Sequence, residues 1–219
     1  MQSEAISLDE RRAVPRSQAL RRPNPRRPLH LTAARRSVLP NAVIGTLVFV
    51  GSEAMFFAGL ISAFLVLRAG STVWPPADQP RLPIFVTTIN TVILLASGYT
   101  MERAVRTARA AERCAAAEWL GATLLLGVVF LAIQGSEWLR LLSYELYASS
   151  GLYGATFYTH IGAHGMHVLG AVIALLLVRR LVVSQRDATR EGAAVEACRV
   201  YWFFVVGVWP ILFVLVYLV

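Results

Sequence analysis

Three histidines lie inside one long apolar stretch, residues 154–178, which reads GATFYTHIGAHGMHVLGAVIALLLV. His160, His164 and His167 follow an i, i+4, i+7 spacing, which places them on one helix face within roughly 60° of arc. Ionisable side chains are costly in an apolar membrane span, so they normally face protein or water. The spacing therefore predicts a helix face that does not contact lipid.

Histidines on one face could bind a metal ion or a haem. However, His160 and His167 are separated by about 10.5 Å along a helix axis, too far to ligate one ion. His160 and His164 as a pair would need ligands from elsewhere. A bis-histidine haem needs a histidine on a facing span, and the remaining histidine, His30, precedes the spans. We therefore expect no metal or haem in this chain and interhelical hydrogen bonding instead, often worth only about 0.6 kcal/mol per pair.

Glu53 lies about halfway along another apolar segment, in GSEAMFFAGLISAFLVLR. Desolvation disfavours a lone carboxylate at that depth, so we expect Glu53 to be neutral or paired. It could hydrogen-bond a neighbouring helix, relay protons or meet a lipid headgroup. The histidines of residues 154–178 are its expected partners.

Other polar side chains lie nearer the ends of the spans. Gln134 and Glu137, one turn apart in IQGSEW, are expected to form an interfacial cap. Glu196, close to Arg199, is expected to be a charge at a helix start. The chain has no nucleophile–base set, phosphate loop or CxxCH motif, so nothing indicates catalysis by this chain alone.

These side chains must be positioned by membrane spans. Hydrophobic residues make up 56% of the 219 residues, above the 45–50% typical of soluble domains. Backbone groups in lipid must bond internally, which predicts an all-α membrane protein, a bundle of five transmembrane helices within residues 38–219. The expected spans are Leu39–Leu67, Leu82–Met101, Ala117–Leu139, Leu152–Val178 and Val200–Leu218.

The basic residues predict the orientation of the bundle. All 21 are arginines, and only Arg68, Arg81 and Arg140 lie on one side of the spans. The others lie in the N-terminal arm or between spans two and three and spans four and five. The positive-inside rule then puts the N-terminus in the cytoplasm and the C-terminus outside. The net charge of +8 is thus a topology signal and does not indicate nucleic-acid binding.

Segments outside the spans give weaker signals. Residues 1–37 are rich in arginine and proline without an apolar core, so we expect a flexible cytoplasmic arm or one lying on an anionic membrane surface. Trp74-Pro75-Pro76 is expected to form an extended turn at the outer interface. Small residues within the spans should mark close helix contacts; they are Gly45, Gly51, Gly59, Gly121, Gly127, Gly162, Gly165 and Gly170.

The order of these features resembles subunit III of the haem-copper cytochrome oxidases, in its short five-helix bacterial form. The resemblance covers nearly all of residues 40–219 and includes an SE-x-MFF helix, a Q-x-x-EW feature, an H-G-x-H-V stretch and a closing E-x4-YW segment. The residues that carry it are Ser52, Glu53, Met55, Phe56, Phe57, Thr88, Asn90, Thr91, Gln134, Glu137, Trp138, His164, His167, Glu196, Tyr201, Trp202, Phe204 and Trp209.

This chain departs from the family pattern in the closing segment. Phe203 stands where the family usually has histidine, Val206 stands where it has aspartate, and Pro210 directly follows Trp209. A polar contact of the last helix is therefore lost. The departures are also typical of a divergent branch, such as the subunit III-like partners of some nitric oxide reductases.

The resemblance implies a non-catalytic subunit of a proton-pumping terminal oxidase in a bacterial plasma membrane. It would bind no redox cofactor, because haem and copper belong to subunits I and II. It would pack on subunit I, hold phospholipid, and support proton uptake and the durability of the oxidase. Glu53 would face the lipid cleft or subunit I, and the family-motif histidines would brace the helices.

Two other functions remain open at this point. One is an accessory subunit of a nitric oxide reductase. The other is a small proton-coupled transporter that uses Glu53 and the histidines, although the spans show no matching halves such as transporters commonly have.

Overall fold

The chain forms five long helices in a computed structural model, which describes residues 41–71, 84–143, 147, 149, 151–184 and 188–218. The helices are α1 (Asn41–Ala69), α2 (Ile84–Arg109), α3 (Arg113–Ser143), α4 (Leu152–Ser184) and α5 (Ala188–Phe213), and a π-helical turn, η1 (Val214–Leu218), continues α5. All five are long and apolar enough to cross a membrane, which confirms the predicted fold class. The arginine-rich arm and the Trp74-Pro75-Pro76 turn lie outside the described residues.

The helices extend past several of the expected span ends. α2 continues from Met101 to Arg109, and α5 begins at Ala188, well before Val200. Hydropathy marks only the part of a helix inside the hydrocarbon layer. Backbone hydrogen bonding continues into charged sequence, where pairs such as Glu102–Arg106 at i, i+4 support it. Both extensions lie at the end of the bundle that the arginine counts predict to be cytoplasmic.

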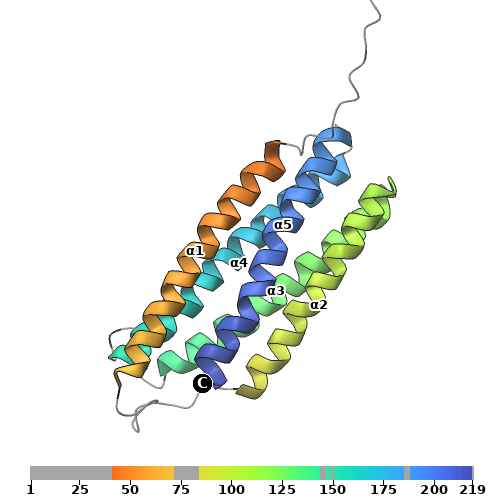
Figure 1. The fold of residues 1–219 in the computed structure, drawn as a ribbon. Coiled ribbons are helices and arrows are strands. Elements are labelled where there is room, and N and C mark those ends of the chain that lie inside the picture. The colour runs from red at the N-terminus through yellow and green to blue at the C-terminus, as the bar shows by residue number, and fades with distance from the viewer. Residues whose placement is uncertain are drawn as a thin grey trace, which may run out of the picture. The chain divides into compact units, whose positions relative to one another are not determined.

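Four of the helices pack in a ring, and the fifth lies beside it. α2 packs on α3, α3 on α4, α4 on α5, and α5 returns to α2. α1 lies mainly against α5 and touches α4 less. In Figure 1, α1 runs along the bundle beside α4 and α5. α1 is also the least covered helix, because only 11% of the residues in its apolar stretch are buried inside the bundle.

Two tryptophans of α5 fill the centre of the ring. Trp202 and Trp209 are fully buried. The Trp202 indole N–H donates to the Ser97 hydroxyl at 3.2 Å, and the Trp209 N–H donates to Thr91 Oγ1 at 2.9 Å. An unpaired indole N–H in this apolar interior would be destabilising. The two α2 hydroxyls avoid that cost by accepting hydrogen bonds from both indoles.

Only some of the glycines mark close helix contacts. A Cβ atom added at Gly127 of α3 would lie 2.6 Å from Trp202 Cη2 and 3.1 Å from Val172 Cγ2, and one at Gly165 would lie 3.2 Å from Trp138 Cη2. In contrast, a Cβ at Gly45, Gly51 or Gly59 of α1 would meet no atom within 4 Å. The expectation of close contacts was therefore wrong for α1 within this chain, because that face of α1 lies on the outside of the bundle.

Substituting Gly127 by alanine tests the packing of Trp202. The new methyl group would displace a fully buried indole, so we expect Gly127→Ala to lower the free energy of unfolding by about 1–3 kcal/mol. Gly45→Ala adds the same methyl group into open space and should leave stability unchanged or slightly raised. Thermal unfolding of the purified chain in mild detergent, followed by circular dichroism, compares the two. Equal melting temperatures would contradict the close contact.

Candidate functional site

The candidate site is the seam between α1 and α4, where Glu53 meets His167. Glu53 Oε2 lies 2.7 Å from His167 Nε2, and both side chains are largely buried, with exposed fractions of 19% and 18%. His167 Nδ1 lies 2.6 Å from the Ala163 carbonyl oxygen on its own helix. The ring nitrogen facing that carbonyl must be the donor, so Nε2 either accepts a hydrogen bond from a neutral Glu53 or, as part of an imidazolium, donates one to its carboxylate. Either way, the pair shares one proton.

Aromatic rings surround this pair. The rings of Phe56 and Phe57 lie 6.2 and 5.0 Å from the His167 ring, between centroids. The Tyr201 hydroxyl of α5 donates to the His167 carbonyl oxygen at 3.4 Å. The SE-x-MFF segment therefore supplies both the carboxyl group and the rings that shield it from lipid.

His160 forms a second contact between α4 and α1. Its Nδ1 lies 2.7 Å from the Thr156 carbonyl oxygen, and its Nε2 lies 2.9 Å from the Leu60 carbonyl oxygen of α1. The Phe64 ring packs on it at 5.5 Å between centroids, and the residue is 3% exposed. His160 and His167 thus lie on the face of α4 that is turned toward α1.

His164 lies on the same arc but points into the ring of helices. It is 1% exposed, and neither ring nitrogen has a hydrogen-bond partner. Its ring lies 5.0 Å from that of Trp209, and the rings of Phe57 and Phe130 are also close. His164 therefore packs as an aromatic side chain. The i, i+4, i+7 spacing predicted a shared face but could not show that the face meets different neighbours at its two edges.

Gln134 lies inside the bundle, where it connects α3 with α2 and η1. Gln134 is 4% exposed; its Nε2 donates to the Tyr217 hydroxyl at 3.2 Å, and its Oε1 accepts from Asn90 Nδ2 at 3.5 Å. Glu137 is also buried, at 5% exposed, and pairs with Arg140 at 3.2 Å. Gln134 reaches α2 and η1 because the end of the chain returns over α3, whereas Glu137 bonds to its own helix. Hydropathy alone cannot predict this contact.

Trp138 is half-buried beside α4. Its ring lies 6.4 Å from that of Tyr158 and covers Gly165. Trp138 of α3 therefore packs against α4.

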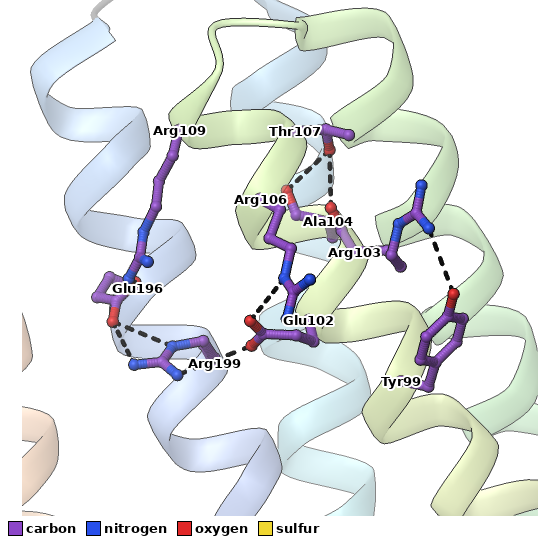
Figure 2. A network of polar contacts seen from close by, with 9 residues as sticks. All are labelled: Tyr99, Glu102, Arg103, Ala104, Arg106, Thr107, Arg109, Glu196 and Arg199. Carbon is purple, nitrogen blue, oxygen red and sulfur yellow. Dashed lines mark hydrogen bonds and ion pairs between the residues drawn. The ribbon is translucent and has the colours of Figure 1, made fainter.

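Glu196 belongs to an ion-pair network at the charged end of α2 and α5, shown in Figure 2. It pairs with Arg199 at 2.6 Å and with Arg109 at 3.1 Å, while Glu102 pairs with Arg106 at 3.1 Å and lies 3.9 Å from Arg199. Glu196 lies well inside α5, so the expectation of a helix-start charge was wrong. Sequence reasoning missed the roles of Glu102 and Arg109, although the i, i+4 spacing of Glu102 and Arg106 was a usable signal.

The family departures in α5 produce an apolar contact with α2. Phe203 and Val206 both reach within 3.7 Å of the position a Cβ would take at Gly98. Val206 is buried, and Phe203 is partly exposed at 38%. The lost polar pair is replaced by packing against a glycine.

In the described part of the chain, no group of three or more His, Cys, Asp or Glu side chains could hold a metal ion. The site consists of hydrogen-bonded ionisable groups between membrane helices. The fold and this site define a multi-pass membrane protein with a polar seam inside a helical bundle.

Comparison with known proteins identifies the family. A family model described as "Cytochrome c oxidase subunit III" matches residues 31–219. A cytochrome c oxidase subunit 3 of Synechocystis is 32% identical over 80% of this chain and 75% of its own length. Probable cytochrome c oxidase subunit 3 proteins of Nocardia farcinica and Mycobacterium leprae are 37% and 33% identical, each over 82% of this chain and 89% of its own length.

The chain belongs to the cytochrome c oxidase subunit III family. Membership makes it a multi-pass membrane component of a cytochrome c oxidase complex in aerobic respiration. The resemblance seen in the sequence is confirmed. The transporter hypothesis has no support from these relatives.

Two substitutions of Glu53 test the proton shared with His167. Glu53→Gln keeps a donor for a neutral imidazole, so we expect stability within about 0.5 kcal/mol of the native chain. Glu53→Leu leaves the imidazole nitrogen without a partner and should cost about 1–3 kcal/mol. Thermal unfolding of both variants in the same detergent distinguishes them. An equal loss in both would show that the seam requires a charged carboxylate.

Proposed function

We propose that this chain is the non-catalytic subunit III of a bacterial terminal oxidase, packing on subunit I in the plasma membrane. Haem and copper would belong to subunits I and II. The open face of α1 carries the proposal, because Gly45, Gly51 and Gly59 lie on it with no atom within 4 Å of a Cβ. Small residues in membrane helices favour close approach of another helix. We infer that transmembrane helices of subunit I cover this face.

Glycine substitutions on α1 test that docking face. Gly51→Leu and Gly59→Leu should leave the isolated chain stable, since both positions are open, but should strongly reduce its recovery with subunit I from mild detergent. Gly135→Leu on α3 is a matched control, because a Cβ there also meets nothing within 4 Å. Recovery of subunit I is quantified by mass spectrometry and by the haem spectrum. Unchanged recovery with the α1 variants would place the interface elsewhere.

The same pull-down separates the oxidase from the remaining alternative. A copper-binding subunit II among the recovered proteins would support the oxidase. A nitric oxide reductase subunit without it would favour the accessory role typical of the Phe203 and Val206 departures. The family name of every relative described above favours the oxidase.

We also propose that the seam beside α1 holds phospholipid. An apolar groove of about 270 Å³ lies toward one end of the bundle, lined by Thr46, Phe49, Ala174, Val178, Ala194, Ala197, Cys198 and Tyr201. A second, of about 210 Å³, lies toward the other end between α1 and α4. The Glu53–His167 pair lies between the two along α1. Apolar grooves at membrane depth suit acyl chains, and the nearby arginines of the cytoplasmic end suit phosphate groups.

Filling the larger groove tests lipid binding. Ala174→Leu combined with Ala194→Leu should reduce the phospholipid retained per chain after purification, because each leucine occupies part of the groove. Ala132→Leu, at an exposed position of α3, is the matched control. Lipid content is measured by mass spectrometry of the purified complex. Equal retention in all three proteins would contradict binding in this groove.

We further propose that the subunit supports proton uptake and the durability of the oxidase, a role implied by the resemblance and not by a contact within this chain. Oxidase complexes prepared with and without the subunit would differ in two measurable ways. Those without it should show slower proton uptake and a shorter working life during turnover. Identical behaviour would contradict this part of the proposal.

A further inference from the structure

His160 lies between two oxygen atoms that can only accept hydrogen bonds. Its Nδ1 faces the Thr156 carbonyl oxygen at 2.7 Å, and its Nε2 faces the Leu60 carbonyl oxygen of α1 at 2.9 Å. A neutral imidazole has one N–H group, so one of these contacts would oppose a nitrogen lone pair to a carbonyl lone pair. An imidazolium has two N–H groups and donates to both carbonyls.

The neighbouring His167 shows why this arrangement is unusual. It also faces a carbonyl oxygen of its own helix through Nδ1 and an oxygen of α1 through Nε2. There, however, the α1 oxygen belongs to the Glu53 carboxyl group, which can carry the proton itself. The backbone carbonyl of Leu60 cannot. An additional proton at the His160 contact could therefore reside only on the imidazole ring.

A groove connects His160 with the end of the bundle at which α1 ends and α4 begins. His160 lines it together with Leu60, Ala63, Phe64, Leu67, Leu152, Ala155, Thr156 and Thr159, and its volume is about 210 Å³. Leu67 and Leu152 lie near the helix ends and are 41% and 43% exposed. The groove thus extends from the ring to exposed positions near the ends of the two helices, on the side that the arginine counts predict to be the outer one.

The charged and titratable groups around His160 are few. α1 carries Glu53 and Arg68 on either side of Leu60 along the helix, and α4 carries Tyr153, His164 and His167. At the end of the chain, Tyr217 of η1 contacts the ring of Phe157. In the described residues no carboxylate forms an ion pair with His160, since Glu53 pairs with His167. The two carbonyl oxygens are the acceptors available to a charged ring.

We propose that His160 is a proton-binding site whose imidazolium form fastens α1 to α4. His160 is not one of the histidines of the family motif, and the inference does not depend on the proposed oxidase partners. With the proton bound, both interhelical and intrahelical bonds form. When the proton leaves, the ring retains one bond, and the contact between α1 and α4 at this end of the bundle weakens. Attachment of α1 is therefore strongest at acidic pH and decreases as pH rises.

The protonation state can be measured directly in the full-length chain. The protein is labelled with ¹⁵N-histidine and reconstituted in phospholipid vesicles, and its imidazole nitrogens are followed by solid-state NMR from mildly acidic to alkaline pH. Variants that lack each histidine in turn assign the signals. We expect His160 to show two protonated nitrogens at mildly acidic pH and a single protonated nitrogen after it titrates. A neutral ring throughout that range would overturn the proposal.

The proposed weakening of the contact is tested by measuring the distance between α1 and α4. Spin labels on cysteines at positions 67 and 152, in a chain with Cys114→Ser and Cys198→Ser, report the separation of α1 and α4 by pulsed electron resonance. The distance should lengthen over the same pH range in which His160 titrates. In His160→Gln, which cannot titrate, it should be independent of pH, whereas in His164→Gln the pH response should persist. A pH response that survives His160→Gln, or titration of His160 without any change in distance, would overturn the proposed fastening of α1.

Discussion

The pairing of two indole N–H groups with two hydroxyls is the interaction on which the bundle depends. Trp202 and Trp209 occupy the space enclosed by α2, α3, α4 and α5, and their donors reach Ser97 and Thr91. In lipid no water is present to compensate an unpaired donor, and lipid supplies no hydrophobic drive between helices. Large rings with satisfied donors give the helices both contact area and a fixed register.

The α1–α4 seam follows from that arrangement. Because α5 is turned toward the ring centre by its tryptophans, its other side presents Tyr201 and Phe204 to α1, where they meet Phe49 and Phe57. α1 then lies close enough to α4 for Glu53 and the Leu60 carbonyl to reach two histidines. Grooves remain on either side because α1 contacts α4 through few side chains. The seam is polar at its contacts and apolar between them.

Much of this could be predicted from sequence, and the rest has identifiable reasons. The fold class followed from five apolar segments, and the face of α4 followed from the spacing of its histidines. The particular pairing of Glu53 with His167 could not be derived, because it depends on the position of α1 along the bundle axis relative to α4. The contact of Gln134 with Tyr217 could not be derived either, because the two residues lie 83 positions apart in the chain. The lengths of α2 and α5 were underestimated because hydropathy does not detect a helix that continues into water.

The ring also explains the departure of the last helix from its family. At the two positions where the family resemblance leads us to expect histidine and aspartate, Phe203 and Val206 pack against Gly98. A buried polar pair is stable only when each group forms its hydrogen bonds with the other. An apolar contact with a glycine requires only complementary shape. The closing segment therefore still fixes α5 against α2 through Trp202 and Trp209.

The position of α1 has a consequence for how the chain is made. Among the five described helices α1 comes first in the chain, yet its main packing partner, α5, comes last. At about 5–20 residues per second, the roughly 120 residues between them take on the order of 10 s to translate. For most of that interval the Glu53 carboxyl group lacks His167 of α4, the histidine that will share its proton. α1 therefore leaves the ribosome with an unpaired polar group and reaches its final position only after α4 and α5 have been made.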